Sequence, residues 1–286
     1  FTMVLNSQPT GDVAIGLSSS DTTEGSVAPT SLTFTAATWN IAQTVTVTGV
    51  DDGSIDGAIA YSIITAPATS SDANYNGVNP GDVSVSNSDN DNAGVTVVES
   101  GGSTGVTEGG ATDTYTVVLT SQPSSNVAIV LGVGAQLSLS PSNLTFTAAN
   151  WNVAQTVTVT ATDDAVVEGP HNAAITHSTS SSDPNYSGTA VAGINVDITD
   201  NDSATVGFAL ANVSQPEATS PMVLTVSLSN PVASGVTLNV NSAFGTALAA
   251  DFTPVVNGTV SFPASSTTPQ SVQVVINNDA LDEDDE

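Results

Sequence analysis

Acidic side chains recur in groups along the 286-residue sequence, and their type and spacing could do chemistry. One kind of group directly follows a run that alternates Thr with Val, and another has the form Asp-Asn-Asp. Carboxylate oxygens held close together suit Ca²⁺, which takes six to eight oxygen ligands. The grouped acids are Asp51, Asp52, Asp56, Asp89 and Asp91 in the first third of the chain; Glu108, Asp163, Asp164, Glu168, Asp197, Asp200 and Asp202 in the middle; and Glu217, Asp251, Asp279, Asp282, Glu283, Asp284, Asp285 and Glu286 in the last.

The charge balance of the chain leaves these acids almost without partners. The sequence has 28 Asp and Glu, no Lys or Arg and two His, for a formal net charge of −28. Binding to nucleic acid and attraction to an anionic membrane surface are excluded, because both need basic side chains. Grouped carboxylates must therefore repel one another, stay solvated or bind cations. Their repeated placement favours Ca²⁺ over the alternative of a solvated acidic loop that aids solubility.

An internal repeat organises the chain. Residues 32–48 and 144–160 lie 112 positions apart and differ at only two places. A diverged third copy follows, in which QSVQVVINND (270–279) parallels QTVTVTATDD (155–164). The predicted domains are 1–91, which lacks its first strand, 92–202, and 203–286, which is truncated at its C-terminus. Because the first and third copies are cut within the unit, we expect a window on a longer polypeptide.

Local patterns predict β-strands throughout. Residues 155–162 alternate Thr with Val or Ala, which is typical of a strand with one buried face and one solvated face. Short Val-, Leu- and Ile-rich runs are separated by Gly, Pro, Asn, Asp and Ser, and no stretch has a sustained helical period. The predicted fold class is all-β, with tandem immunoglobulin-like sandwiches. We expect Trp39 and Trp151, at equivalent repeat positions, to pack in a core or corner.

The third copy resembles a Calx-beta domain. The resemblance rests on LTVSLSNP (224–231), Asp251-Phe252, VSF (260–262) and the tail INNDALDEDDE (276–286). That family is a seven-stranded immunoglobulin-like sandwich that binds calcium through acids of these segments. The resemblance implies calcium ligands at Glu217, Asp251, Asp279, Glu283 and Glu286 in the third copy, and at Glu108, Asp163, Asp164, Glu168, Asp200 and Asp202 in the second.

Two departures from the family pattern bear on the sites. His171 stands where the last Glu of the second copy's acidic loop would be, and the first copy has lost its opening Glu. The first copy keeps Asp51, Asp52, Asp56, Asp89 and Asp91 as metal candidates. We therefore expect these two copies to hold fewer ions or to bind them more weakly. Both copies also resemble repeats of very large bacterial surface and adhesion proteins.

No catalytic constellation emerges from the remaining residues. His171 and His177 are the only histidines, and without further His or Cys ligands we interpret them as solvent-exposed. Ser is abundant, but no Gly-x-Ser-x-Gly elbow occurs. Paired carboxylates could hydrolyse glycosides, yet aromatic residues of the kind that line sugar clefts make up only 5%. We therefore predict that the protein is not an enzyme.

The leading hypothesis is a mechanical one. Tandem sandwiches with Ca²⁺ at their junctions would form a stiff stalk or adhesin extender at the cell surface, outside the cell. One alternative is a subunit of an extracellular filament or surface layer, assembled by β-strand complementation. Another is a calcium-sensing module that changes the angle between domains. The expected partners are neighbouring repeats or copies of the same protein, with surface glycans or other cells as further candidates, and no membrane insertion is expected in this segment.

Overall fold

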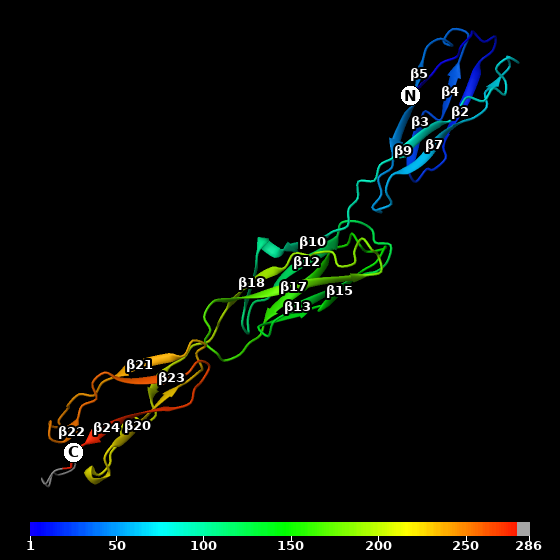
Figure 1. Ribbon diagram of the computed structural model, residues 1–286. Helices are drawn as coiled ribbons and strands as arrows, with labels where there is room; N and C mark the ends of the chain where they lie inside the picture. The colour runs from blue at the N-terminus through cyan, green and yellow to red at the C-terminus, as the bar shows by residue number, and fades with distance from the viewer. Residues whose placement is uncertain (279–286) are drawn as a thin grey trace.

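The structure is a computed structural model, and it describes residues 1–278. Its regular elements in that range are β-strands and two single-turn 3₁₀ segments, so the predicted all-β class is confirmed. Three separate hydrophobic cores lie along the chain. Figure 1 shows the three corresponding sandwiches end to end, with the two termini at opposite ends of the molecule. Within the described residues, no helix is long and apolar enough to cross a membrane.

The second sandwich is the most complete and shows the topology best. One sheet has the antiparallel order β10-β12-β16-β14, and the other has the order β11-β18-β17-β13-β15, in which β11 runs parallel to β18. The core lies between the two sheets and is the largest of the three. Its elements are β10 (Val95–Glu99), η1 (Ser100–Gly102), β11 (Thr104–Thr107), β12 (Asp113–Leu119), β13 (Val127–Val133), β14 (Leu137–Ser140), β15 (Asn143–Phe146), β16 (Gln155–Ala161), β17 (His171–Ser181) and β18 (Ile194–Thr199).

The first and third sandwiches are variations on this plan. In the first, β4-β2-β7-β9 form the main sheet, β8 pairs with β2, and β1–β5 and β3–β6 form two-stranded pairs. In the third, β19-β20-β24-β22 form one sheet and β21–β23 the other. The bounds are β1 (Thr2–Met3), β2 (Val13–Ser19), β3 (Gly25–Ala28), β4 (Ser31–Phe34), β5 (Gln43–Thr44), β6 (Thr46–Gly49), β7 (Ile59–Thr65), β8 (Thr69–Ser70), β9 (Val83–Asn87), β19 (Val206–Phe208), η2 (Glu217–Thr219), β20 (Met222–Leu228), β21 (Val236–Val240), β22 (Phe252–Thr253), β23 (Gly258–Phe262) and β24 (Gln270–Ile276).

The alternation seen in the sequence explains why β16 folds as it does. Val157 and Val159 are fully buried, whereas the alternating Thr side chains of the strand lie on the outer face. β-branched residues fit this half-buried pleated surface well. The strand ends at Ala161, and the Asp-Asp pair that follows therefore begins a loop at one end of the sandwich.

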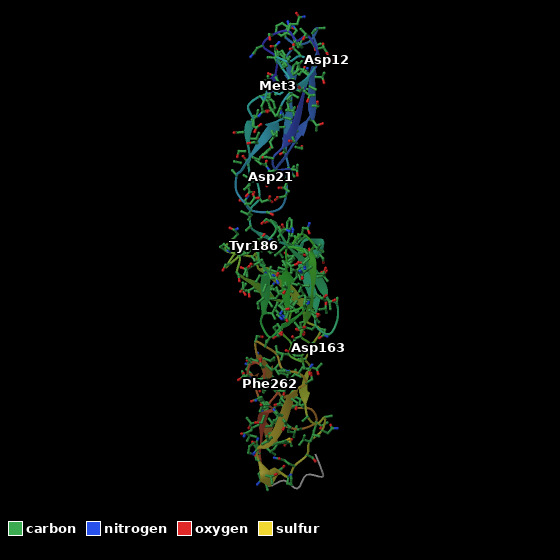
Figure 2. All side chains as sticks on the ribbon, turned by 90° about the vertical axis from the view of Figure 1, so that its right-hand side faces the viewer. Met3, Asp12, Asp21, Asp163, Tyr186 and Phe262 are labelled. Carbon is green, nitrogen blue, oxygen red and sulfur yellow. The ribbon has the colours of Figure 1, made fainter. Side chains whose placement is uncertain are left out.

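A repeated Ser-Asp-x-Asn-Tyr motif fixes the opposite end of the first and second sandwiches. In the second, the Ser124 and Asn185 N–H groups donate to the two carboxylate oxygens of Asp183, at 2.8 and 2.9 Å. The Tyr186 hydroxyl donates to the Ser121 carbonyl at 2.7 Å. Asp72 and Tyr75 make the same kinds of bonds in the first sandwich. Figure 2 shows Tyr186 at the end of the second sandwich that faces the first, and Asp163 at the end that faces the third.

Each sandwich touches the next through a loop of the acidic end. Ser54 forms a parallel bridge with Gln122, whose N–H donates to the Gly53 carbonyl. At the second junction Val167 bridges Val232 in the same way. Trp151 lies at the first junction, where its ring packs closely against Gly53. The predicted packing role of Trp151 therefore includes an interdomain contact.

We predict that Asp183→Asn destabilises the second sandwich by about 1–3 kcal/mol, because two backbone N–H groups lose their charged acceptor on a buried side chain. Desolvation acts to raise the pKa of Asp183, but the hydrogen bonds from Ser124 and Asn185 outweigh it and the pKa is lowered. The stabilisation is therefore complete above the unfolded value near 4 and is lost as the pH falls toward the folded pKa. Hydrogen exchange of the Ser124 and Asn185 amides measures the destabilisation and its pH dependence.

The exposed neighbour Ser182 supplies the control, since no side-chain hydrogen bond involves it in the described structure. Ser182→Ala should leave exchange at both amides unchanged. Equal exchange in Asp183→Asn and the wild-type protein at neutral pH would show that the carboxylate does not hold this end together.

Candidate cation centre

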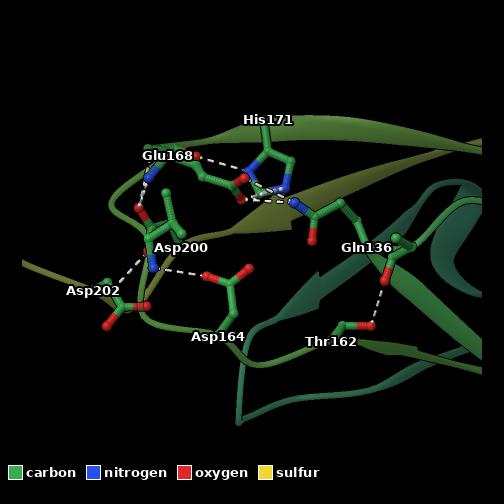
Figure 3. A network of polar contacts seen from close by, with 10 residues as sticks. Gln136, Thr162, Asp164, Glu168, His171, Asp200 and Asp202 are labelled. Carbon is green, nitrogen blue, oxygen red and sulfur yellow. Dashed lines mark hydrogen bonds and ion pairs between the residues drawn. The ribbon is translucent and has the colours of Figure 1, made fainter. Parts of the chain in front are cut away.

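The acidic end of the second sandwich is built from three segments that are distant in sequence. Glu108 follows β11, Asp164 and Glu168 lie in the loop between β16 and β17, and Asp200 and Asp202 follow β18. Figure 3 shows the last four of these residues around the loop that ends at His171. The sandwich topology therefore brings together acids that the sequence places almost a hundred residues apart.

Asp200 organises the loops instead of standing free. Its Oδ2 accepts the N–H groups of Glu168 and Gly169, at 2.7 and 2.6 Å, and its Oδ1 accepts the N–H of Asp202 at 2.7 Å. The hydrogen bond from Asp202 is the first cause that lowers the pKa of Asp200. This carboxylate is thus ionised and ties the β16–β17 loop to the segment after β18.

Glu108 has the opposite environment. Its side chain is 1% exposed, and neither carboxylate oxygen has a hydrogen-bond partner among the described residues. Burial raises its pKa, and the negative charges of Asp200, Asp164 and Glu168 raise it further. A buried carboxylate without partners is unstable as an anion unless a cation compensates it.

Two sets of ligand atoms surround Glu108. In one, Glu108, Asp164 and Asp202 each offer an oxygen, and the three oxygens lie within 4.8 Å of one another. In the other, Glu108 and Glu168 combine with His171 within the same limit. Burial and then the neighbouring charge of Asp200 raise the pKa of Asp202 as well. The unpartnered oxygens and the all-oxygen first set fit a hard cation such as Ca²⁺.

Not every predicted ligand of this end joins these sets. Asp163 accepts a 3.4 Å hydrogen bond from Asn201, whose amide also donates to the Glu108 carbonyl at 2.9 Å. Asp163 therefore lies beside the centre, while Asp200 holds backbone N–H groups. Glu108, Asp164, Glu168 and Asp202 are the predicted residues that the structure brings together as potential ligands.

The first sandwich has a similar arrangement, built from a different ligand set. Asp89 accepts the N–H groups of Asp56, Gly57 and Asp91, as Asp200 does in the second sandwich. Glu24, Asp52 and Asp56 offer oxygens within 4.8 Å of one another. These residues line a cavity of about 310 Å³, together with Asp51, Asp89 and Asp91.

Glu24 is a candidate ligand that sequence reasoning missed. It lies between β2 and β3 and does not belong, in sequence, to the groups of acids that follow the Thr/Val-alternating strand of the repeat. Its position is 112 residues before Gln136, whose side-chain amide donates to Glu168 at 2.8 and 3.0 Å. That repeat offset was the available signal, because it places Glu24 against the same loop.

Only part of the predicted site of the third sandwich lies within the described residues. Asp251 is buried and its Oδ2 accepts the N–H of Leu248, and Glu217 begins η2. Neither belongs to a set of three potential ligands within the described residues. The predicted partners Asp279, Glu283 and Glu286 lie outside the described residues.

The expectation that both histidines are solvent-exposed was wrong. His171 is 21% exposed and its Nε2 lies 3.4 Å from an oxygen of Glu168. His177 packs edge-on against Tyr115, with ring centroids 5.6 Å apart, and its Nε2 lies 3.2 Å from the Tyr115 hydroxyl. Burial lowers the pKa of His177. Both rings lie on β17 and turn toward the sandwich, which an isolated sequence position could not reveal.

Comparison with known proteins bears on the third sandwich. Residues 199–286 match the family model of the Calx-beta domain. This stretch is similar to a Calx-beta domain. The match begins at Thr199, so the matched stretch includes Asp200 and Asp202 at the second junction. The suspected resemblance is thereby confirmed for the third copy.

Solved structures match this chain at low identity. One is CBD12 from CALX1.2, with 18% identity, a TM-score of 0.28, and coverage of 63% of this chain and 76% of that one. Another is surface layer protein SbsC, domains 4–9, with 11% identity, a TM-score of 0.28, and coverage of 97% of this chain and 36% of that one. Scores this low say nothing about what this chain binds. No curated protein sequence matches.

We predict that Glu108→Gln stabilises the second sandwich at neutral pH when calcium is chelated, because the substitution removes a buried charge. A raised folded pKa means that wild-type stability increases as the pH falls through that value toward the unfolded one. The Glu108→Gln protein should lack this increase. Thermal unfolding between neutral and mildly acidic pH, in chelator, measures the difference.

Glu99→Gln is the matched control, because Glu99 has a partner in the Thr104 hydroxyl at 2.7 Å. It should reproduce the wild-type pH dependence. A neutral-pH loss of stability in Glu108→Gln under chelation would contradict the assignment of Glu108 as an uncompensated charge.

Proposed function

We propose that this chain is the structural repeat region of an extracellular, calcium-binding surface protein, in which Ca²⁺ stiffens a stalk or adhesin extender. The proposed role is binding and mechanical, without catalysis. The proposed partners are neighbouring repeats and further copies of the protein, and the cell surface is the proposed location. The all-β sandwiches in series and the match of residues 199–286 to the Calx-beta family model support this role.

The observation that carries the proposal is the double use of the β16–β17 loop. Asp164 and Glu168 face the candidate cation centre, and Val167 between them contacts the third sandwich. The Val167 N–H donates to the Pro231 carbonyl at 2.8 Å, and the Ala233 N–H donates to the Val167 carbonyl at 3.0 Å. A cation that fixes the acids therefore also fixes the backbone that joins the two sandwiches.

At the first junction, too, one loop carries both candidate ligands and the contact to the next sandwich. Asp52 and Asp56 belong to the candidate ligand set of the first sandwich, and Ser54 lies between them. The Ser54 hydroxyl donates to the Gln122 side-chain carbonyl at 3.1 Å, beside the backbone bridge between these residues. Each acidic loop thus contributes residues to the ligand set of its own sandwich and also contacts the next sandwich.

Electrostatics explains why the cation would change stiffness and not only stability. Without it, the carboxylates of each end repel one another in a chain that has no basic residue to compensate them. Repulsion separates the loop from Glu108 and loosens the contacts of Val167. Ca²⁺ converts this repulsion into shared attraction at both ends of the loop.

We predict that calcium raises the melting temperature by about 10–20 °C relative to chelator. Ligand at about 100 times its Kd stabilises a domain by about 2.7 kcal/mol, and about 1 kcal/mol shifts the transition of a domain this size by about 4–8 °C. Scanning calorimetry of the full chain measures the shift in melting temperature. Small-angle scattering measures the maximum dimension of the protein with calcium and with chelator. Calcium should also narrow the distribution of interdomain angles.

Matched ionic strength with a monovalent salt is the control and should not reproduce the shift. An unchanged melting temperature would refute calcium stiffening and leave the acids as solvated loops. A change of mean interdomain angle at micromolar calcium would replace the stalk with a sensor. Calcium-independent filaments of a regular subunit length would favour assembly by strand complementation.

The contact between the first two sandwiches can be disrupted without changing a candidate ligand. A Cβ at Gly53 would come within 2.5 Å of the Trp151 ring, so Gly53→Val should open the first junction without removing a carboxylate. Scattering should show a broader range of shapes in calcium, while calcium-dependent unfolding stays at the wild-type temperature. Gly81→Val is the control, because a Cβ there meets nothing within 4 Å. Wild-type stiffness in Gly53→Val would show that this contact does not couple the sandwiches.

A further inference from the structure

We propose that the second sandwich carries a nitrogen-containing metal position, formed by Glu108, Glu168 and His171, that takes a first-row transition dication such as Zn²⁺. It rests on the proposed cation centre in one respect, since Glu108 belongs to both ligand sets. The two positions are otherwise distinct, because Asp164 and Asp202 serve only the all-oxygen set and His171 serves only this one.

The first support is the geometry of the three groups. One ligand atom from each lies within 4.8 Å of the other two. Glu108 is 1% exposed and both of its oxygens lack partners among the described residues. The Nε2 atom of His171 is also buried without a hydrogen-bond partner there. A buried carboxylate and a buried ring nitrogen are thus directed at the same space.

The hydrogen bond at the other ring nitrogen fixes which form of His171 can bind. Its Nδ1 lies 2.9 Å from the Gly169 carbonyl oxygen, which can only accept. Nδ1 therefore carries the hydrogen, and in the neutral ring Nε2 presents its lone pair to the carboxylates. A metal-binding His is held in this way, with its second N–H donated to a carbonyl or a carboxylate. Figure 3 shows the ring turned toward Glu168.

The surrounding contacts hold the ligands in place. The Gln136 side-chain amide donates to both oxygens of Glu168, at 2.8 and 3.0 Å, and so orients that carboxylate. The Gly169 N–H donates to Asp200 at 2.6 Å, which anchors the carbonyl that holds His171. Supporting hydrogen bonds of this kind raise metal affinity because they reduce the freedom lost on binding.

Donor chemistry selects the class of metal. Imidazole nitrogen suits Zn²⁺ and its first-row neighbours, whereas Ca²⁺ takes oxygen ligands. The first sandwich provides an internal contrast, because Ile59 stands 112 residues before His171 and Glu24 stands 112 before Gln136. Its ligand set is therefore entirely oxygen, and the nitrogen-containing position is specific to the second sandwich.

The rival explanation is a protonated His171 paired with Glu168 at 3.4 Å, with no metal. The chain contains only two histidines, so imidazole nitrogen resonances distinguish the two cases without labelling single sites. Zn²⁺ is added to the full-length, calcium-free protein while the ring ¹⁵N signals are recorded. We expect the His171 Nε2 signal to shift by the amount typical of metal coordination, and the His177 signals to stay in place.

His171→Gln should weaken zinc binding, measured by calorimetry, by at least about tenfold. Glu168→Gln keeps both rings and should likewise reduce the zinc-dependent shift of His171. No shift at His171, or equal shifts at both histidines, would overturn the proposal in favour of the ion pair or of adventitious binding. Zinc affinity in both variants equal to that of the wild-type protein would overturn it as well.

Calcium-dependent unfolding of His171→Gln distinguishes this proposal from the calcium stalk. If the zinc position exists and the stalk proposal fails, zinc shifts His171 and calcium does not stabilise either protein. If only the stalk proposal holds, calcium stabilises both proteins and zinc leaves His171 unshifted.

Discussion

The absence of basic side chains determines how every acid in this molecule is satisfied. A carboxylate that folding removes from water needs a hydrogen-bond donor or a cation, because an isolated buried charge is strongly unfavourable. With no Lys or Arg, the chain can supply only N–H and hydroxyl donors and two imidazole rings. Asp183 and Asp200 use backbone N–H groups, whereas Glu108 has no partner among the described residues. The buried acids therefore divide into anchors of the backbone and candidates for cation binding.

Anchors and candidate ligands alternate along the same short segments, which couples them mechanically. Asp200 accepts the N–H of Glu168, a candidate ligand, and the N–H of Asp202, which belongs to the other ligand set. The loop that Asp200 holds also carries Val167 to the third sandwich. A displacement of the ligands is consequently a displacement of the junction, since no flexible linker separates the two. The repeat of this pattern around Asp89 gives both junctions the same connection.

Sequence alone predicted the sandwiches because their signals are local. The Thr/Val alternation of residues 155–161 specifies one buried face, and the repeated segments specify where such strands recur. The acids after these strands were found for the same reason. Glu24 was not, because it reaches its centre from the loop between β2 and β3, far in sequence from the acids that follow β6. His171 was placed in the acidic loop, but its interpretation as solvent-exposed missed its place in a ligand set. Nor could sequence separate Asp200 from Asp202, since their difference lies in which backbone N–H groups fold against them.

The two described acidic ends show that the repeat preserves the backbone anchors more strictly than the ligands. Asp89 and Asp200 accept hydrogen bonds from equivalent N–H groups, but the side chains around them differ. Glu24 and Ile59 in the first sandwich correspond to Gln136 and His171 in the second. In the second, Gln136 uses its amide to orient Glu168, so an acid is replaced by a donor. Such exchanges change charge and ligand type without moving the loop. Such exchanges would therefore alter the candidate ligand set of one sandwich while its junction keeps its geometry.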